Sequence, residues 1–82
     1  MTKCKAYFTL RFMSDSSQVT NSIKELRARF NLTQEDLATR VGVTRQTIIS
    51  IEKNEYVPSL TLGLKIAKVF ELPVEQVFTL IS

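Results

Sequence analysis

Residues 44–54 read TRQTIISIEKN and carry several side chains that could make specific contacts with a partner. A helix turns by roughly 100° per residue, so Ile48, Ile51 and Glu52 would lie along one side of a helix in this stretch. The other side would carry Gln46, Ile49, Ser50 and Lys53, with Arg45 at its start. We expect the first side to pack within the protein. The second side is expected to face something outside the chain.

The length of the chain, 82 residues with 44% hydrophobic content, predicts one small globular domain. A chain near this size buries only about 60% of the surface that it exposes when unfolded. Its stability then gains from a partner subunit or from whatever the domain binds. Oligomerisation is therefore expected before any motif is considered.

The charge balance permits nucleic-acid binding without requiring it. The net charge is +3 and the sequence pI is about 9.3. Three basic residues and one acidic residue give residues 1–20 a charge of +2, which leaves +1 for residues 21–82. Any basic surface on the main part of the chain must therefore be local.

The cysteine and histidine content excludes several kinds of site. The chain has one cysteine, Cys4, and no histidine. An intramolecular disulfide and the usual zinc ligand sets are therefore impossible. A nucleophile with a recognisable base and a phosphate-binding glycine loop are also missing. We expect no metal, no cofactor, no small-molecule ligand and no enzymatic activity.

A cytoplasmic location is expected for three reasons. A single thiol suits a reducing compartment. Arg11 interrupts the apolar run near the N-terminus, and no small-residue cleavage site follows it, unlike a signal peptide. No run approaches the ~18 apolar residues of a membrane span, so no membrane association is expected.

Residues 1–20 are interpreted as an N-terminal arm. Residues 3–12 alternate with a period of two, which predicts a β-strand that pairs with another short strand or with another protomer. The residues of one parity are Cys4, Ala6, Phe8, Leu10 and Phe12. A disordered tail, with initiation at Met13, is the alternative. The polar residues 14–22 are interpreted as a linker or cap region.

Five helices are expected after the arm. The first covers about residues 22–30 and the second begins after Thr33, which forms a capping-box pattern with Asp36. Gly42 occupies a helix stop, Thr44 caps the third helix and Asn54 occupies a second stop.

The fourth helix opens at residues 58–59 and is apolar around much of its girth, so we expect it to be central. It carries Leu60, Leu64, Ala67 and Phe70, with Ile66 and Val69 beside them. A short fifth helix from Pro73 to about Phe78 precedes an extended end at 79–82.

These elements resemble the Cro/phage-repressor helix-turn-helix superfamily, often called the XRE family, over residues 21 to about 80. The fragments that carry the resemblance are IKELR at 23–27, LTQEDLA at 32–38, GVTRQTI at 42–48, IE at 51–52, PSL at 58–60 and KIAKVF at 65–70. The resemblance implies an all-α fold, a compact five-helix lambda-repressor-like DNA-binding domain over residues 21–82. The N-terminal strand or arm would be an addition to it.

The resemblance also implies which residues contact DNA. The recognition helix of such proteins reaches base edges in the major groove, which here implies base contacts from Arg45, Gln46, Ile49 and Ser50. A merely solvated polar face is the alternative. Phosphate contacts are implied for Gln34, Thr44, Thr47, Lys53 and Asn54, with helix capping a second role for Thr44.

Comparison with the family pattern implies one further contact and shows one departure. Arg27 and Glu52 are expected to form an internal ion pair, because an acid on the packed side of the third helix needs a partner. Many relatives have Asn-Gly-Lys after the recognition helix, whereas this chain has Lys53, Asn54 and Glu55. The carboxylate of Glu55 has the wrong charge for a phosphate neighbour and predicts moderate affinity.

The function that we expect is a sequence-specific double-stranded DNA-binding transcriptional regulator, a repressor that binds a palindromic operator as a homodimer. The dimer surface is expected to combine the fifth helix, residues 77–81 and the N-terminal strand. The alternative is an antitoxin-like or accessory protein-interaction module with the same fold. The outward-facing Ile49 and the arm favour that alternative.

Overall fold

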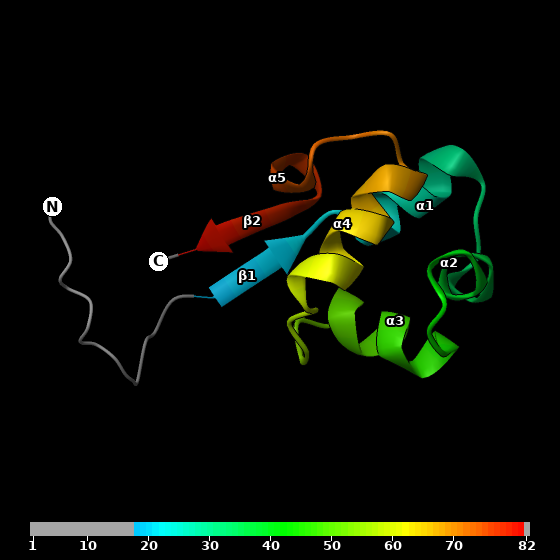
Figure 1. The fold of residues 1–82 in the computed structure, drawn as a ribbon, viewed down its shortest axis with the longest axis horizontal. Helices are drawn as coiled ribbons and strands as arrows, with labels where there is room; N and C mark the ends of the chain where they lie inside the picture. The colour runs from blue at the N-terminus through cyan, green and yellow to red at the C-terminus, as the bar shows by residue number, and fades with distance from the viewer. Residues whose placement is uncertain (1–17, 82) are drawn as a thin grey trace, which may run out of the picture.

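The computed structural model describes residues 18–81, which form five helices and a two-stranded sheet (Figure 1). In chain order the elements are β1 (Gln18–Asn21), α1 (Ile23–Phe30), α2 (Gln34–Val41), α3 (Arg45–Glu52), α4 (Leu60–Val69), α5 (Val74–Val77) and β2 (Phe78–Ile81). The predicted five-helix architecture is confirmed. The strand predicted at residues 3–12 lies outside the described residues.

Helix α4 is central, as predicted, and it buries part of the expected apolar stripe but not its first two leucines. It packs against α2 on one side and α5 on the other. Its core side chains are Leu62, Ile66 and Ala67, together with Phe70 at its C-cap. Leu60 and Leu64 were expected in the apolar stripe, yet they are 73% and 50% exposed. A helix that is apolar all round leaves the choice of buried face to its neighbours.

The short sheet corrects the interpretation of residues 18–21 as part of a linker or cap region, whereas residues 14–17 lie outside the described residues. Residues 18–21 form β1, which pairs antiparallel with β2 so that Val19 lies opposite Leu80 and Asn21 opposite Phe78. A four-residue strand with one aliphatic side chain gives little period-two signal. The extended end predicted at 79–82 is confirmed for residues 79–81.

The fifth helix is shorter than predicted. It covers Val74–Val77, because the chain becomes extended at Phe78 to pair with β1. Val77, which was expected in a dimer surface, is buried in the core with 1% exposure. Of the stretch 77–81, the exposed part that such a surface can use therefore follows Val77.

Side-chain caps fix the starts of three helices. The Thr33 hydroxyl accepts from the Asp36 amide at 2.9 Å, and the Asp36 carboxylate accepts from the Thr33 amide at 3.0 Å, so the predicted capping box is confirmed. The hydrogen bond from the Thr33 backbone holds the pKa of Asp36 below its ordinary value. Thr44 caps α3 and Ser59 caps α4 through their hydroxyl groups.

Left-handed residues end four helical segments, at Asn31, Gly42, Asn54 and Glu71. At the end of α2, Gly42 has φ 79°, and the amide of Val43 donates to the Ala38 carbonyl at 3.0 Å. This is the hydrogen-bonded stop that Gly and Asn favour. Glu71, with φ 58°, is the one residue of the four without a local preference for this conformation.

Helix α3 is tied to α1 and α2 by a hydrogen-bonded group that we call the Glu52 network, comprising Arg27, Leu32, Gln34 and Glu52. Arg27 donates to both carboxylate oxygens of Glu52, from Nε at 2.7 Å and from Nη2 at 3.2 Å. Its Nη1 donates to the Leu32 carbonyl at 3.1 Å, and Gln34 Nε2 donates to Glu52 Oε1 at 3.3 Å. The Arg27 and Glu52 side chains are only 15% and 9% exposed, so water screens this ion pair weakly.

The Glu52 network predicts a large difference between a single and a double substitution. Glu52→Leu leaves the Arg27 guanidinium poorly hydrated and without its carboxylate, so we expect a loss of about 3 kcal/mol in the free energy of unfolding. The double variant Arg27→Met/Glu52→Leu removes both charges and should recover most of that loss. Urea unfolding measures the free energy of unfolding of the single and the double variant. Glu55→Gln, at an exposed site, should change stability by less than about 0.5 kcal/mol. Equal stability of Glu52→Leu and the unmodified protein would contradict this role.

The two left-handed positions Gly42 and Glu71 predict stability changes of opposite sign. Nothing lies within 4 Å of a Cβ added at Gly42, so Gly42→Ala should cost about 1–2 kcal/mol through backbone strain alone. Glu71→Gly should raise stability by about 0.5–1 kcal/mol, since glycine adopts this φ without strain. Glu71→Ala separates charge from conformation, because it keeps the strain and removes only the carboxylate. If the alanine and glycine variants at residue 71 are equally stable in urea, the conformational explanation is wrong.

Candidate nucleic-acid interface

Helices α2 and α3, with the turn at residues 42–44, form a packed helix-turn-helix unit. Leu37, Ala38 and Val41 of α2 are buried, as are Ile48 and Ile51 of α3. Ala38 is only 1% exposed, so a larger side chain at this position would push the packed helices apart. The inner face of α3 is therefore fixed against the core.

The outer face of α3 is open to solvent in the part of the chain that the structure describes. Arg45 and Gln46, at the start of α3, are exposed, and Ile49 and Ser50 are half-buried. In Figure 1 α3 runs along the lower edge of the molecule, away from the sheet and α5. An exposed helix held by a packed inner face has the shape that enters a major groove.

The Thr44 side chain is engaged within α3. Its hydroxyl accepts from the Thr47 amide at 3.3 Å and lies 3.1 Å from the Thr47 hydroxyl. Both hydroxyl groups are thus partly satisfied before any partner binds. Of the two roles considered for Thr44, the structure shows the capping role.

The start of α2 brings Gln34 close to α3. Its side-chain amide donates to Glu52, which ties the expected phosphate-contacting side chain to the core of the motif. The backbone amides of Asp36 and Leu37 bond to Thr33, whereas those of Gln34 and Glu35 have no intrahelical acceptor. Unpaired amides at a helix start favour an anionic neighbour.

Three of the expected contact residues line one hollow between α1, the start of α2 and α3. They are Gln34, Ile49 and Lys53, and the hollow also touches Lys24, Arg27 and Glu52. The structure therefore brings the start of α2 and the outer face of α3 together, as a groove-and-phosphate contact requires. Glu52 contributes negative charge to this hollow, but its carboxylate is engaged by Arg27.

The last turn of α3 has its backbone amides occupied. The Asn54 amide donates to the Ile51 carbonyl at 3.0 Å and the Glu55 amide to the Ser50 carbonyl at 2.9 Å. Asn54 was expected to contact a phosphate, but its backbone amide and that of Glu55 donate to carbonyls of α3. The exposed side chains of Lys53 and Asn54 are what this end of α3 presents.

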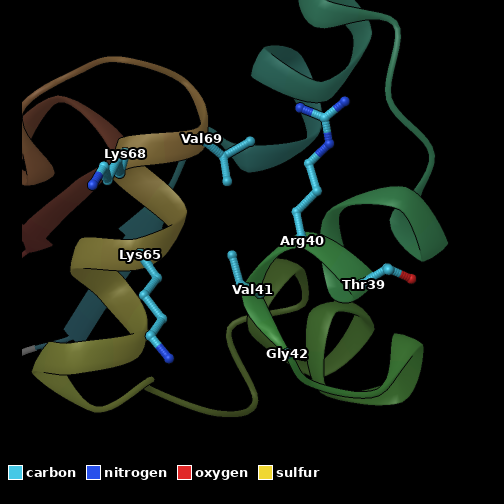
Figure 2. Close-up of a pocket in the computed structure, with 7 residues that line it drawn as sticks. All are labelled: Thr39, Arg40, Val41, Gly42, Lys65, Lys68 and Val69. Carbon is cyan, nitrogen blue, oxygen red and sulfur yellow. The ribbon is translucent and has the colours of Figure 1, made fainter.

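A second hollow lies between α2 and α4 and is bordered by Arg40, Lys65 and Lys68 (Figure 2). Val41 and Val69 also line it. In Figure 2 the Arg40 side chain extends toward α1, whereas Lys65 extends in the opposite direction. The three cations do not converge on one point, so they resemble solvated charges more than a built anion site.

Sequence reasoning missed the role of Asn21, which it placed among possible caps for the first helix. Asn21 Oδ1 accepts from the Ile23 amide at 3.2 Å, while Asn21 Nδ2 donates to the Ile51 carbonyl at 2.9 Å. Ser22, at the N-cap position, makes no side-chain cap. A cap-forming residue type before α1 was the available signal, but the sequence does not show a contact 30 residues away.

Among the described residues, no helix is long and apolar enough to cross a membrane. The same residues contain no group of three or more His, Cys, Asp or Glu side chains that could hold a metal ion.

The helix-turn-helix family matches residues 23–77 of this chain. The chain is similar to the uncharacterized HTH-type transcriptional regulator YgzD of Bacillus subtilis, with 60% identity over 60 residues, or 73% of this chain and 91% of YgzD. It is also 32% identical over 57 residues to the CTXphi transcriptional repressor RstR of Vibrio cholerae, a match that covers 70% of this chain and 51% of RstR.

The fold is similar to a solved structure of the restriction-modification controller protein C.AhdI from Aeromonas hydrophila. The TM-score is 0.62 at 30% identity, over 66% of this chain and 82% of C.AhdI. Residues 23–77, which match the helix-turn-helix family, include the Glu52 network, the turn at Gly42 and the whole of α3. By sequence and by fold, the chain belongs to the helix-turn-helix family of the Cro/phage-repressor type.

Proposed function

We propose that this protein is a sequence-specific double-stranded DNA-binding transcriptional regulator. The observation that carries the proposal is the pair of exposed side chains, Arg45 and Gln46, at the leading end of a helix whose opposite face is buried. Arg pairs best with guanine and Gln with adenine in the major groove. Ile49 and Ser50 follow on the same face, with Ile49 suited to a thymine methyl group.

Phosphate contacts from both ends of the motif would set the orientation of α3 in the groove. Gln34 and the free amides at the start of α2 supply one contact, and Lys53 with the Asn54 side chain supplies the other. Thr44 and Thr47 can add hydroxyl donors between them. The exposed carboxylate of Glu55 beside Lys53 opposes a close phosphate and makes the affinity of one copy moderate.

We propose further that two copies bind together on a palindromic operator. Exposed apolar side chains on the described part of the chain include Val57, Leu60, Leu64, Leu80 and Ile81. Val57 and Leu60 line an apolar groove together with Val19 and Phe78, so the sheet and the start of α4 form an apolar surface there. Exposed apolar regions of this kind mark interaction sites, and a two-fold dimer would place two α3 helices about 34 Å apart.

Repression is the direction of regulation that we propose. The similarity to RstR, a protein named as a transcriptional repressor, supports it. A dimer that occupies an operator acts by covering DNA and needs no further chemistry.

Selection of bound fragments from random duplexes at physiological salt tests the function. The expected result is an inverted repeat with half-sites one helical turn apart. Binding should weaken steeply with salt, because phosphate contacts release counterions. Enrichment of no sequence would overturn the proposed function, and a single half-site without its repeat would overturn the dimer on a palindrome.

Arg45→Ala and Gln46→Ala are expected to weaken binding to the selected duplex by roughly tenfold to a hundredfold each and to relax the base preference at one position. Their exposure predicts unchanged stability. Gel-shift competition between the selected duplex and single-base variants measures the preference. Lys65→Ala is the matched control, since it removes an exposed charge from another face. If Arg45→Ala keeps the full base preference, the assigned readout is wrong.

The second candidate function is a protein-interaction module, antitoxin-like or accessory, and the same apolar surface favours it. A protein of this class would bury Leu60 and Leu64 against a different protein and would show no sequence preference on DNA. Sedimentation of the purified protein with and without duplex distinguishes the two functions. A monomer that binds DNA weakly and without selection favours the interaction module.

A further inference from the structure

The contact of interest lies at the C-terminal end of α3, where helix carbonyls lack intrahelical partners. The left-handed Asn54 turns the chain there, with φ 62°. The Ile51 carbonyl accepts from the Asn54 amide and also from a side chain that comes from another part of the molecule. That side chain belongs to Asn21, the last residue of β1.

Both ends of the Asn21 amide are in use. Nδ2 donates to the Ile51 carbonyl at 2.9 Å and faces the Asn54 side-chain oxygen at 3.3 Å, while Oδ1 accepts from the Ile23 amide at 3.2 Å. The reverse orientation would place an oxygen against the Ile51 carbonyl and an NH₂ group against the Ile23 amide. Only a side chain with a donor and an acceptor on one planar group satisfies both partners.

The backbone of Asn21 is itself held in place. Asn21 pairs with Phe78 across the sheet, and the next amide, of Ser22, donates to the carbonyl of the buried Val77 at 3.0 Å. The side chain therefore joins a fixed point of the sheet to the last turn of α3. Residues 21 and 51 are 30 positions apart, so no local preference maintains this contact.

Helix α3 is thus held on two sides at the same end. The Glu52 network connects it to α1 and α2, and Asn21 connects the neighbouring residue, Ile51, to the sheet. A hydrogen bond from one direction leaves a short helix free to pivot, whereas two from different directions fix both its position and its rotation. Base readout requires side chains held within roughly 0.5 Å and 10–20° of the productive geometry.

We propose that Asn21 is a positioning residue for base readout: it holds the C-terminal end of α3 in register with the sheet and so sets where Arg45 and Gln46 lie in the groove. This role rests on the proposed function. Because β1 also borders the apolar surface proposed for the dimer, Asn21 connects the spacing of two subunits to the orientation of their reading helices.

Asn21→Asp is the sharpest test. It keeps the shape and the acceptor for the Ile23 amide and removes the donor to Ile51. Without DNA, the Asn54 and Glu55 amides should exchange with solvent roughly tenfold faster, while exchange in α2 stays unchanged. With DNA, the ratio of affinities for the selected duplex and a single-base variant should fall roughly tenfold, while the salt dependence of non-specific binding is kept.

Two controls separate positioning from general stability. Ile66→Val removes one methyl group from the core on α4 and leaves the hydrogen bonds of α3 in place, so it should lower stability and leave the affinity ratio unchanged. Asn54→Gly keeps the left-handed turn and removes only the 3.3 Å partner, so it should have a smaller effect than Asn21→Asp. If Ile66→Val, matched in stability, loses the same discrimination, Asn21 has no positioning role.

The outcomes also separate this role from the proposed function. If the unmodified protein selects no sequence, the proposed function fails, and the readout role fails with it. If it selects one and Asn21→Asp selects it equally well, only the positioning role is overturned. Unchanged amide exchange at Asn54 and Glu55 in Asn21→Asp would overturn the positioning role without any DNA experiment.

Discussion

The orientation of α3 depends on the carboxylate of Glu52. An isolated helix of eight residues is marginal in water, so α3 needs its neighbours to persist. Burial of Ile48 and Ile51 stabilises the packing of α3 on the core, but apolar contacts alone allow the helix to slide and rotate. The hydrogen bonds from Arg27 and Gln34 to Glu52 are directional and restrict that freedom. Because the pair is largely buried, it also carries a penalty if either partner is lost.

The two ends of α3 differ in how many of their polar groups are already paired. At the C-terminal end, Ser50 and Ile51 carbonyls, the Glu52 carboxylate and the following amides all have partners in the protein. At the N-terminal end only the Thr44 cap is made, and Arg45 and Gln46 are exposed. A recognition helix requires a rigidly held C-terminal end and unpaired side chains at its N-terminal end, since preorganised contacts lose little conformational entropy on binding.

The parts of the fold that the sequence predicted are those with strong local signals. The capping box at Thr33, the stop at Gly42 and the stop at Asn54 each follow from one residue type at one place. The packing of α4 could not be predicted, because apolar residues on every side leave the buried face to tertiary context. The short strand β1 and the Asn21 contact depend on pairing with residues far along the chain, which composition and periodicity do not encode. Arg45 and Gln46 are exposed at the start of α3, on the side of the helix that the sequence period leaves unpacked.

The length of α3 limits how many base pairs one copy can distinguish. Eight residues span about 12 Å, and base pairs stack about 3.4 Å apart, so the proposed readout by one copy covers about four base pairs at most. A given four-base-pair sequence recurs roughly every 256 positions, which means thousands of occurrences among about 10⁶ competing genomic sites. Two copies at fixed spacing would read about eight base pairs, and such a sequence has roughly fifteen chance matches in the same genome. In the proposed dimer, the number of chance genomic matches is therefore set as much by the pairing of two copies as by any side chain of α3.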